Sequence, residues 1–124
     1  MRSIPLCIVS SLLSLPSSAH HSGAMFESQK VLTLQGTVKA FQWTNPHCWI
    51  QVLVPSGQGP PAEWSVEMGS PAELFRGGWK AHTVNPGDKI IVTVHPMHDG
   101  THGGLFVSAT DAQGRPLGAP RSVP

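Results

Sequence analysis

Short segments of alternating apolar residues, separated by turns rich in glycine and proline, constrain the fold of this chain most. Alternation of this kind is typical of strands that bury one face and expose the other. The 124 residues include 13 glycines and 12 prolines, a composition that favours many tight turns over long helices. The pattern predicts an all-β domain with strands at 31–43, 48–54, 62–68, 89–95 and 105–110.

One short helix is predicted between the third and fourth strands. Ser70 can cap it, Pro71 occupies its first position, Glu73 completes a capping box and Gly77 ends it. Three strands, a helix and two strands is the order of the OB-fold, a small five-stranded Greek-key barrel. A small β-sandwich is the alternative. Gly36 is expected at a bend of the first strand, because glycine permits a bulge or a close backbone approach.

Residues 1–19 have the features of a signal peptide. Arg2 supplies a positive charge, an apolar run follows at 4–15, and small residues at 17–19 form a cleavage site. The run is too short to span a bilayer as a helix. We therefore expect a periplasmic or secreted protein that begins at His20 and has no transmembrane segment in its mature form.

The mature chain is expected to form one domain with three parts. An N-terminal arm covers 20–30, the barrel covers 31–114, and a tail at 115–124 is expected to be loose because it carries three prolines. The arm is too polar and glycine-bearing for regular structure, although Met25 and Phe26 could anchor it to the barrel.

A set of short motifs is spread over the mature chain. These motifs are Ala19-His20-His21-Ser22, Trp43-Thr44-Asn45-Pro46-His47, Gly69-Ser70-Pro71, Gly78-Trp79, Pro86-Gly87-Asp88, His95-Pro96 and Asp99-Gly100. In combination they resemble an uncharacterised bacterial family of small exported proteins that contains a domain of unknown function. The resemblance covers nearly the whole mature chain. It implies export and a single domain, and it brings no activity with it.

Histidine is the unusual residue of the composition, with seven in the chain. In an OB-fold the loop between strands one and two and the loop between strands four and five lie on one binding face. Imidazole rings, together with the free α-amine of an N-terminal histidine, suit a tetragonal ion such as Cu(II). We therefore predict a copper site at His20, His21, His47, His95, His98 and His102. The alternative is that these histidines are solvated loop residues, since no regular ligand spacing is present.

The segment from Trp43 to Trp49 is also a candidate binding site without metal. Trp43 is expected to be a partly exposed stacking platform, with Asn45 and His47 beside it, while the other tryptophans fill the core. Cys48 is expected to be a buried thiol that packs as a small hydrophobe.

Composition narrows the class of partner. Charged residues make up 12% of the chain and the net charge is +1, so nucleic acid is a poor candidate. A small molecule, a glycan or an envelope protein is expected instead. The sequence shows no serine elbow or phosphate-binding loop, and Glu63 and Glu67 are expected on a solvent face. The prediction is therefore a binding module, with an enzyme as the third and least favoured class.

Overall fold

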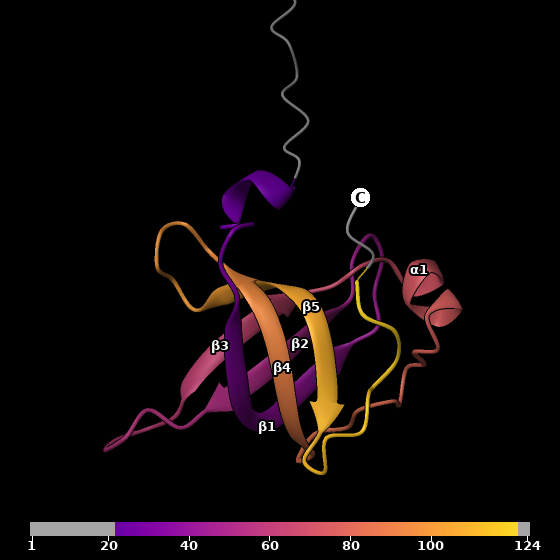
Figure 1. Cartoon of the computed structure of the whole chain (residues 1–124). Coiled ribbons are helices and arrows are strands. Elements are labelled where there is room, and N and C mark those ends of the chain that lie inside the picture. The colour runs from indigo at the N-terminus through magenta and orange to yellow at the C-terminus, as the bar shows by residue number, and fades with distance from the viewer. Residues whose placement is uncertain (1–21, 122–124) are drawn as a thin grey trace, which may run out of the picture.

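The computed structural model describes residues 22–121 and shows a closed five-stranded barrel (Figure 1). Its elements are β1 (Leu32–Gln42), β2 (Trp49–Val54), β3 (Ala62–Glu67), α1 (Pro71–Arg76), β4 (Lys89–Pro96) and β5 (Gly103–Asp111). The strands follow one another around the barrel as β1-β2-β3-β5-β4. β3 and β5 are parallel, and the other neighbours are antiparallel. The prediction of a small barrel with one short α-helix is confirmed, and the β-sandwich is not formed.

β1 curves strongly, and its two halves pair with different neighbouring strands as the barrel closes (Figure 1). It pairs with β4 over 32–37 and with β2 over 37–42. Gly36 lies just before this change of partner, and a Cβ there would overlap the carbonyl oxygen of Leu53. The expected close approach at Gly36 is therefore present. The irregularity in the pairing itself lies between Val38 and Ala40.

The interior of the barrel is filled by the inward-facing residues of the alternating strands. Ile50, Val52 and Val66 have no exposed surface, and neither does Trp79, which follows α1. The Trp79 ring meets Phe106 edge to face with centroids 5.6 Å apart, and so closes one end of the core. Cys48 is a fully buried free thiol, as expected. Burial raises its pKa, which suits a packing role and not a reactive one.

The described part of the N-terminal arm has more structure than expected. Ser22–Met25 form a short 3-10 helix, η1, so the expectation of an irregular arm was wrong there. Phe26 is buried and bridges to Met97, while Met25 is exposed, so of these two side chains it is Phe26 that packs against the barrel. A backbone hydrogen bond of 2.8 Å from Glu27 to Pro96 adds to this contact. Within residues 22–121, no helix is long and apolar enough to cross a membrane.

The C-terminal tail through residue 121 is also ordered against the barrel, contrary to the expectation of a loose segment. The side chain of Asp111 accepts hydrogen bonds from the backbone of Arg115 at 3.0 Å and from its Nε at 2.7 Å. The tail then runs beside β5, where the Leu117 N–H donates to Ala109 and the Arg121 N–H donates to Val107. These contacts give hydrogen-bond partners within the protein to backbone N–H groups that would bond to water in a loose tail.

Candidate functional site

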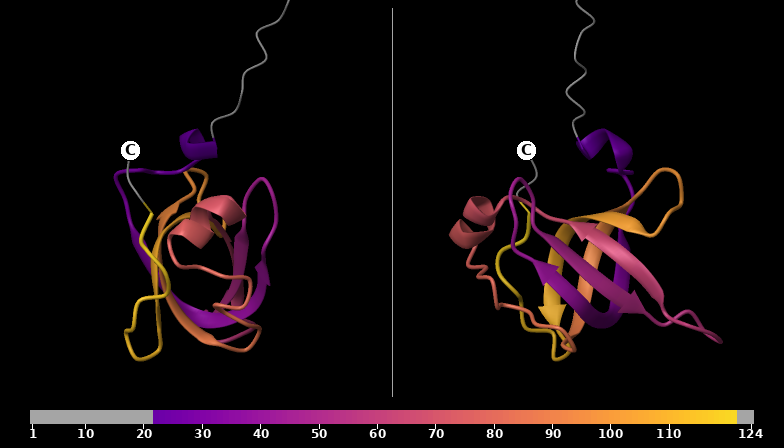
Figure 2. Two further views of the ribbon diagram at one scale, coloured as in Figure 1. Left: turned by 90° about the vertical axis from the view of Figure 1, so that its right-hand side faces the viewer. Right: turned by 180° about the vertical axis from the view of Figure 1, so that it is seen from behind.

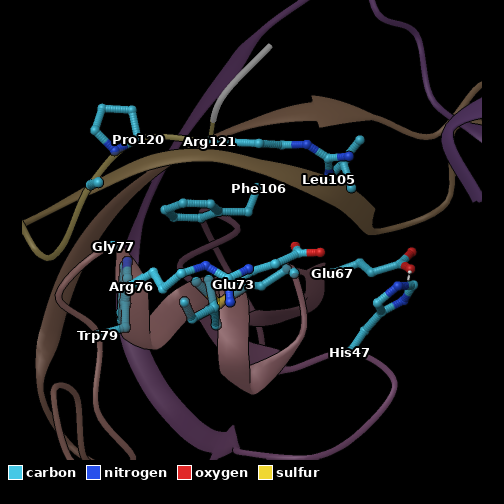
Figure 3. Close-up of a pocket in the computed structure, with 14 residues that line it drawn as sticks. His47, Glu67, Glu73, Arg76, Gly77, Trp79, Leu105, Phe106, Pro120 and Arg121 are labelled. Carbon is cyan, nitrogen blue, oxygen red and sulfur yellow. Dashed lines mark ion pairs between the residues drawn. The ribbon is translucent and has the colours of Figure 1, made fainter. Parts of the chain in front are cut away.

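A pocket of about 690 Å³ opens between the loop at 43–48, α1 and the tail (Figure 3). We call it the α1 pocket, and we call residues 43–48 the first loop. The lining comes from five separate segments of the chain. Its residues are His47, Glu67, Met68, Gly69, Glu73, Leu74, Arg76, Gly77, Trp79, Leu105, Phe106, Ala119, Pro120 and Arg121.

His47 and Glu67 form an ion pair or charged hydrogen bond at one side of this pocket. His47 Nδ1 lies 2.6 Å from Glu67 Oε1. The Glu67 side chain is 9% exposed and the His47 side chain is 39% exposed, so the carboxylate is covered and the imidazole is at the surface. Because Nδ1 is engaged by Glu67, Nε2 is the ring nitrogen left to meet a ligand.

Local hydrogen bonds hold the pair in place. Thr44 Oγ1 donates to the carbonyl of His47 at 2.8 Å, which fixes the first loop. Cys48 exchanges backbone hydrogen bonds of 2.9 Å with Gly69 and Met68, which ties the end of the first loop to the end of β3. The imidazole and the carboxylate are therefore presented by two segments that are joined beside them.

The burial of Glu67 corrects the expectation that Glu63 and Glu67 share a solvent face. Glu63 is exposed and pairs with Lys39 at 2.7 Å. Glu67 lies at the end of the same strand, between Trp49 of β2 and Leu105 of β5. His47 of the first loop pairs with Glu67 there, and Glu67 is buried, so the expectation of a solvent-facing carboxylate was wrong.

One wall of the α1 pocket is apolar. It includes Leu74, Trp79 and Phe106, all of them buried. Trp79 also has an indole N–H with no hydrogen-bond partner among the described residues. Gly118 of the tail lies so close to this ring that a Cβ there would overlap Nε1.

The other wall carries charge. Glu73 and Arg76 come from α1, and Arg121 comes from the tail. Glu73 folds back toward the start of its helix, where a Cβ on Gly69 would overlap its carboxylate. Figure 3 shows the side chains of Arg76 and Arg121 running along opposite sides of the pocket, toward the end where Glu67 and His47 lie.

Of the three residues predicted to bind a ligand in the first loop, only His47 lines the α1 pocket. Trp43 is half-buried and packs edge to face on Phe41, with centroids 5.8 Å apart. Asn45 is exposed on the loop. The prediction that Trp43 is partly exposed agrees with the structure, but Trp43 and Asn45 are not brought to the same cavity as His47.

His95, His98 and His102, the other predicted copper ligands that the structure describes, contact other residues of the protein. His95 Nδ1 lies 2.6 Å from the carbonyl oxygen of Lys30, to which it donates. His98 Nδ1 lies 3.5 Å from Glu27 Oε1. The His102 ring stacks on Trp64 with centroids 5.0 Å apart. His95 and His98 thus hold the N-terminal arm, and His102 covers a tryptophan.

The structure does not gather the predicted copper ligands that it describes. We call residues 97–102 the second loop. Figures 1 and 2 show the first and second loops at the same end of the barrel but on opposite sides of it. Within residues 22–121, no three His, Cys, Asp or Glu side chains are grouped so that they could hold a metal ion. His20 and His21 lie outside the described residues.

Several pocket residues were not predicted from the sequence. Glu67, Arg76 and Arg121 carried no motif, and they are far apart in the chain. Trp79 was expected in the core, and no sequence pattern indicated that it also lines a cavity. Besides His47, the helix cap at Ser70-Pro71 was a signal near the pocket, because it placed α1 after the end of β3.

Comparison with known proteins gives a family but no function. No curated protein and no solved structure matches the chain significantly. A family model described as "Family of unknown function (DUF6152)" matches residues 8–108. This match covers most of the chain and includes the first loop, α1 and the second loop, and it ends before the tail. The chain therefore belongs to the DUF6152 family of unknown function.

Proposed function

We propose that this protein is an exported binding module for a small molecule, and that the α1 pocket is its binding site. The observation that carries the proposal is His47, held by the buried Glu67 at the side of a cavity with an apolar wall. Small-molecule sites are commonly cavities of about 300–1,000 Å³ with mostly apolar walls and a few placed polar groups. The proposal of export rests on the signal-like features of residues 1–19.

The pairing of Glu67 supports a binding role for His47. A buried carboxylate is unfavourable unless a partner compensates it. Glu67 therefore restrains the imidazole, so that Nε2 can donate to or accept from a ligand in a fixed direction.

A thermal-shift screen with a mixture of small organic fragments tests the proposal. Fragments that stabilise the purified protein are expected to lose most of their effect on His47→Gln, because the oriented imidazole is removed. His82→Gln is the matched control, since His82 is exposed and does not line the pocket. Fragments that stabilise wild type and both variants equally would contradict the proposal, and so would a screen without any hit.

Copper binding is a second candidate function, favoured by the same contact between His47 and Glu67. A metal-binding histidine commonly directs its other ring nitrogen at a carboxylate, which orients the ring and makes it more basic. The contact of His47 Nδ1 with Glu67 leaves Nε2 free in this way. With the ring and the α-amine of an N-terminal His20, this nitrogen would give the donor set that Cu(II) prefers.

Titration with Cu(II) tests this second candidate. Protein that begins at His20 is expected to bind more tightly than protein with a methionine ahead of it, because the added residue removes the chelating amine. Affinity should also fall on acidification, since the donors must be deprotonated. His47→Ala is expected to weaken binding and His95→Ala is not, because His95 is engaged with Lys30. Equal affinity in all four proteins would rule out this site.

A further inference from the structure

We propose that the ligand of the α1 pocket is an organic anion with an apolar body, and that Arg76 and Arg121 bind its charged group. This inference rests on the proposed binding function and names the chemical class of the ligand. Some charged side chains in the pocket already have partners within the protein and others do not, and this difference indicates the ligand class.

The pocket lining contains three acidic or imidazole side chains, and two of them pair with each other. His47 and Glu67 form their pair at 2.6 Å. Glu73, the third, has its carboxylate against Gly69 at the start of α1, where the unpaired N–H groups of the first turn favour a negative charge. His47 and Glu67 are therefore paired with each other, and Glu73 lies at a helix end that favours its charge.

The two arginines have no such role. Among residues 22–121, neither Arg76 nor Arg121 takes part in an ion pair. Both side chains are exposed at the pocket and extend along it from opposite sides (Figure 3). The pocket therefore offers two positive charges that the described protein groups do not neutralise. A guanidinium group can donate two parallel hydrogen bonds to a carboxylate, sulfonate or phosphate, which makes arginine suited to such ligands.

The backbone brings the two arginines to the same cavity. Arg76 is the last residue of α1, and the next residue, Gly77, accepts a hydrogen bond of 2.7 Å from the Ala119 N–H of the tail. The Arg121 N–H donates to the carbonyl of Val107 in β5 at 2.8 Å, and this bond ties the tail to β5 at Arg121. Each arginine thus starts from a backbone position that is tied to the barrel or to the other element.

The apolar wall defines the rest of the ligand. Leu74, Trp79 and Phe106 line the same cavity as the arginines. A bare inorganic anion would contact the arginines but would leave this wall unused. An anion with a short aliphatic or aromatic body would also remove apolar surface from water, which favours binding.

Matched probes of equal length test the inference. Octanoate and 1-octanol have the same apolar body, and only octanoate carries a charge at neutral pH. Isothermal titration calorimetry would compare both probes on the wild type, on R76Q, on R121Q and on the double variant. K80Q is the control, because Lys80 is exposed next to Trp79 and does not line the pocket.

We expect octanoate to bind the wild type about tenfold or more tightly than octanol, as one or two charge-assisted hydrogen bonds provide. In the double variant this preference should disappear, with octanol binding unchanged, while K80Q should behave as wild type. Equal affinity for both probes in the wild type would overturn the anion preference and leave the proposed binding function standing. Failure of both probes to bind would overturn the proposed function as well. Circular dichroism on each variant would confirm that the fold is retained.

Discussion

The two loops at the same end of the barrel use histidine in opposite ways. In the first loop, His47 meets a buried carboxylate, Glu67, and lies at the side of a pocket. His98 of the second loop meets the partly exposed Glu27, and His95 at the end of β4 meets a backbone carbonyl, so that both contacts fasten the N-terminal arm. The second loop contains more histidines, but the histidine of the first loop is the one that lies at a pocket and pairs with a buried carboxylate. The partner of a histidine, and the burial of that partner, indicate function better than the number of histidines.

Physical chemistry explains the difference between the two carboxylates. An exposed ion pair is weak because water screens it and two long side chains lose freedom. A buried carboxylate needs its partner, because an uncompensated charge in the interior is strongly unfavourable. Glu67 therefore restrains the position of the His47 side chain, whereas Glu27 makes one of several contacts that hold the N-terminal arm.

The largest expected effect concerns the tail that closes the α1 pocket. Gly118 has φ of 63° and touches Trp79, while Gly100 in the second loop has φ of 75° and open space around it. Alanine is strained at both positions, which costs about 1–2 kcal/mol. Overlap with Trp79 adds about 1–3 kcal/mol at Gly118 alone. Urea unfolding should therefore show a clearly larger loss for Gly118→Ala than for Gly100→Ala. Equal losses would mean that the tail does not pack on Trp79.

A smaller effect is expected from neutralising the two carboxylates. Glu67→Gln should lower the free energy of unfolding by about 1 kcal/mol, because a charged hydrogen bond becomes a neutral one in a buried place. Glu27→Gln should lower it less, since Glu27 is more exposed to solvent than Glu67. Thermal unfolding of the two variants under the same conditions makes the comparison. A larger loss at Glu27 would show that the arm, and not the His47 pair, is the more tightly held region.

The smallest effect is the response of the arm and the tail to acid. The Lys30 ammonium lowers the pKa of Glu27 from 4.5, and backbone donation from Arg115 lowers the pKa of Asp111 from 3.8. A lowered folded pKa means stability that is complete above the ordinary value and is lost as the pH falls through the folded value. Acid should therefore loosen both segments only below these values. Amide NMR signals of His98 and Leu117 would report each segment.

Two substitutions separate the acid responses of the two segments. Glu27→Gln should remove the response of the arm and leave that of the tail, and Asp111→Asn should do the reverse. If the Leu117 signal still shifts normally with acid in Asp111→Asn, another group controls the tail.

The sequence was sufficient for most of the barrel because the strands are defined by local alternation. The capping residues Ser70 and Pro71 likewise placed α1 correctly. The glycine at position 36 indicated where β1 approaches a neighbour. These features depend on residues close together in the chain, so their patterns can be read without the fold.

The α1 pocket could not be read in the same way. Glu67, Arg76 and Arg121 are brought together only by barrel closure and by the hydrogen bonds of the tail. The proline content of the tail suggested a loose segment, because composition does not show that its N–H groups meet β5. The order of η1 similarly depends on a contact with the second loop, where the His98 N–H donates to the Met25 carbonyl, and the arm itself does not encode this contact.

The central claim is that the α1 pocket, and not the second loop, receives the ligand. Amide chemical-shift mapping of the purified protein with octanoate tests this most directly. We predict shifts that concentrate on the end of β3, on α1 and on Phe106, with residues 97–102 unchanged. Shifts that concentrate on residues 97–102 and leave Leu74, Arg76 and Phe106 unaffected would contradict the account.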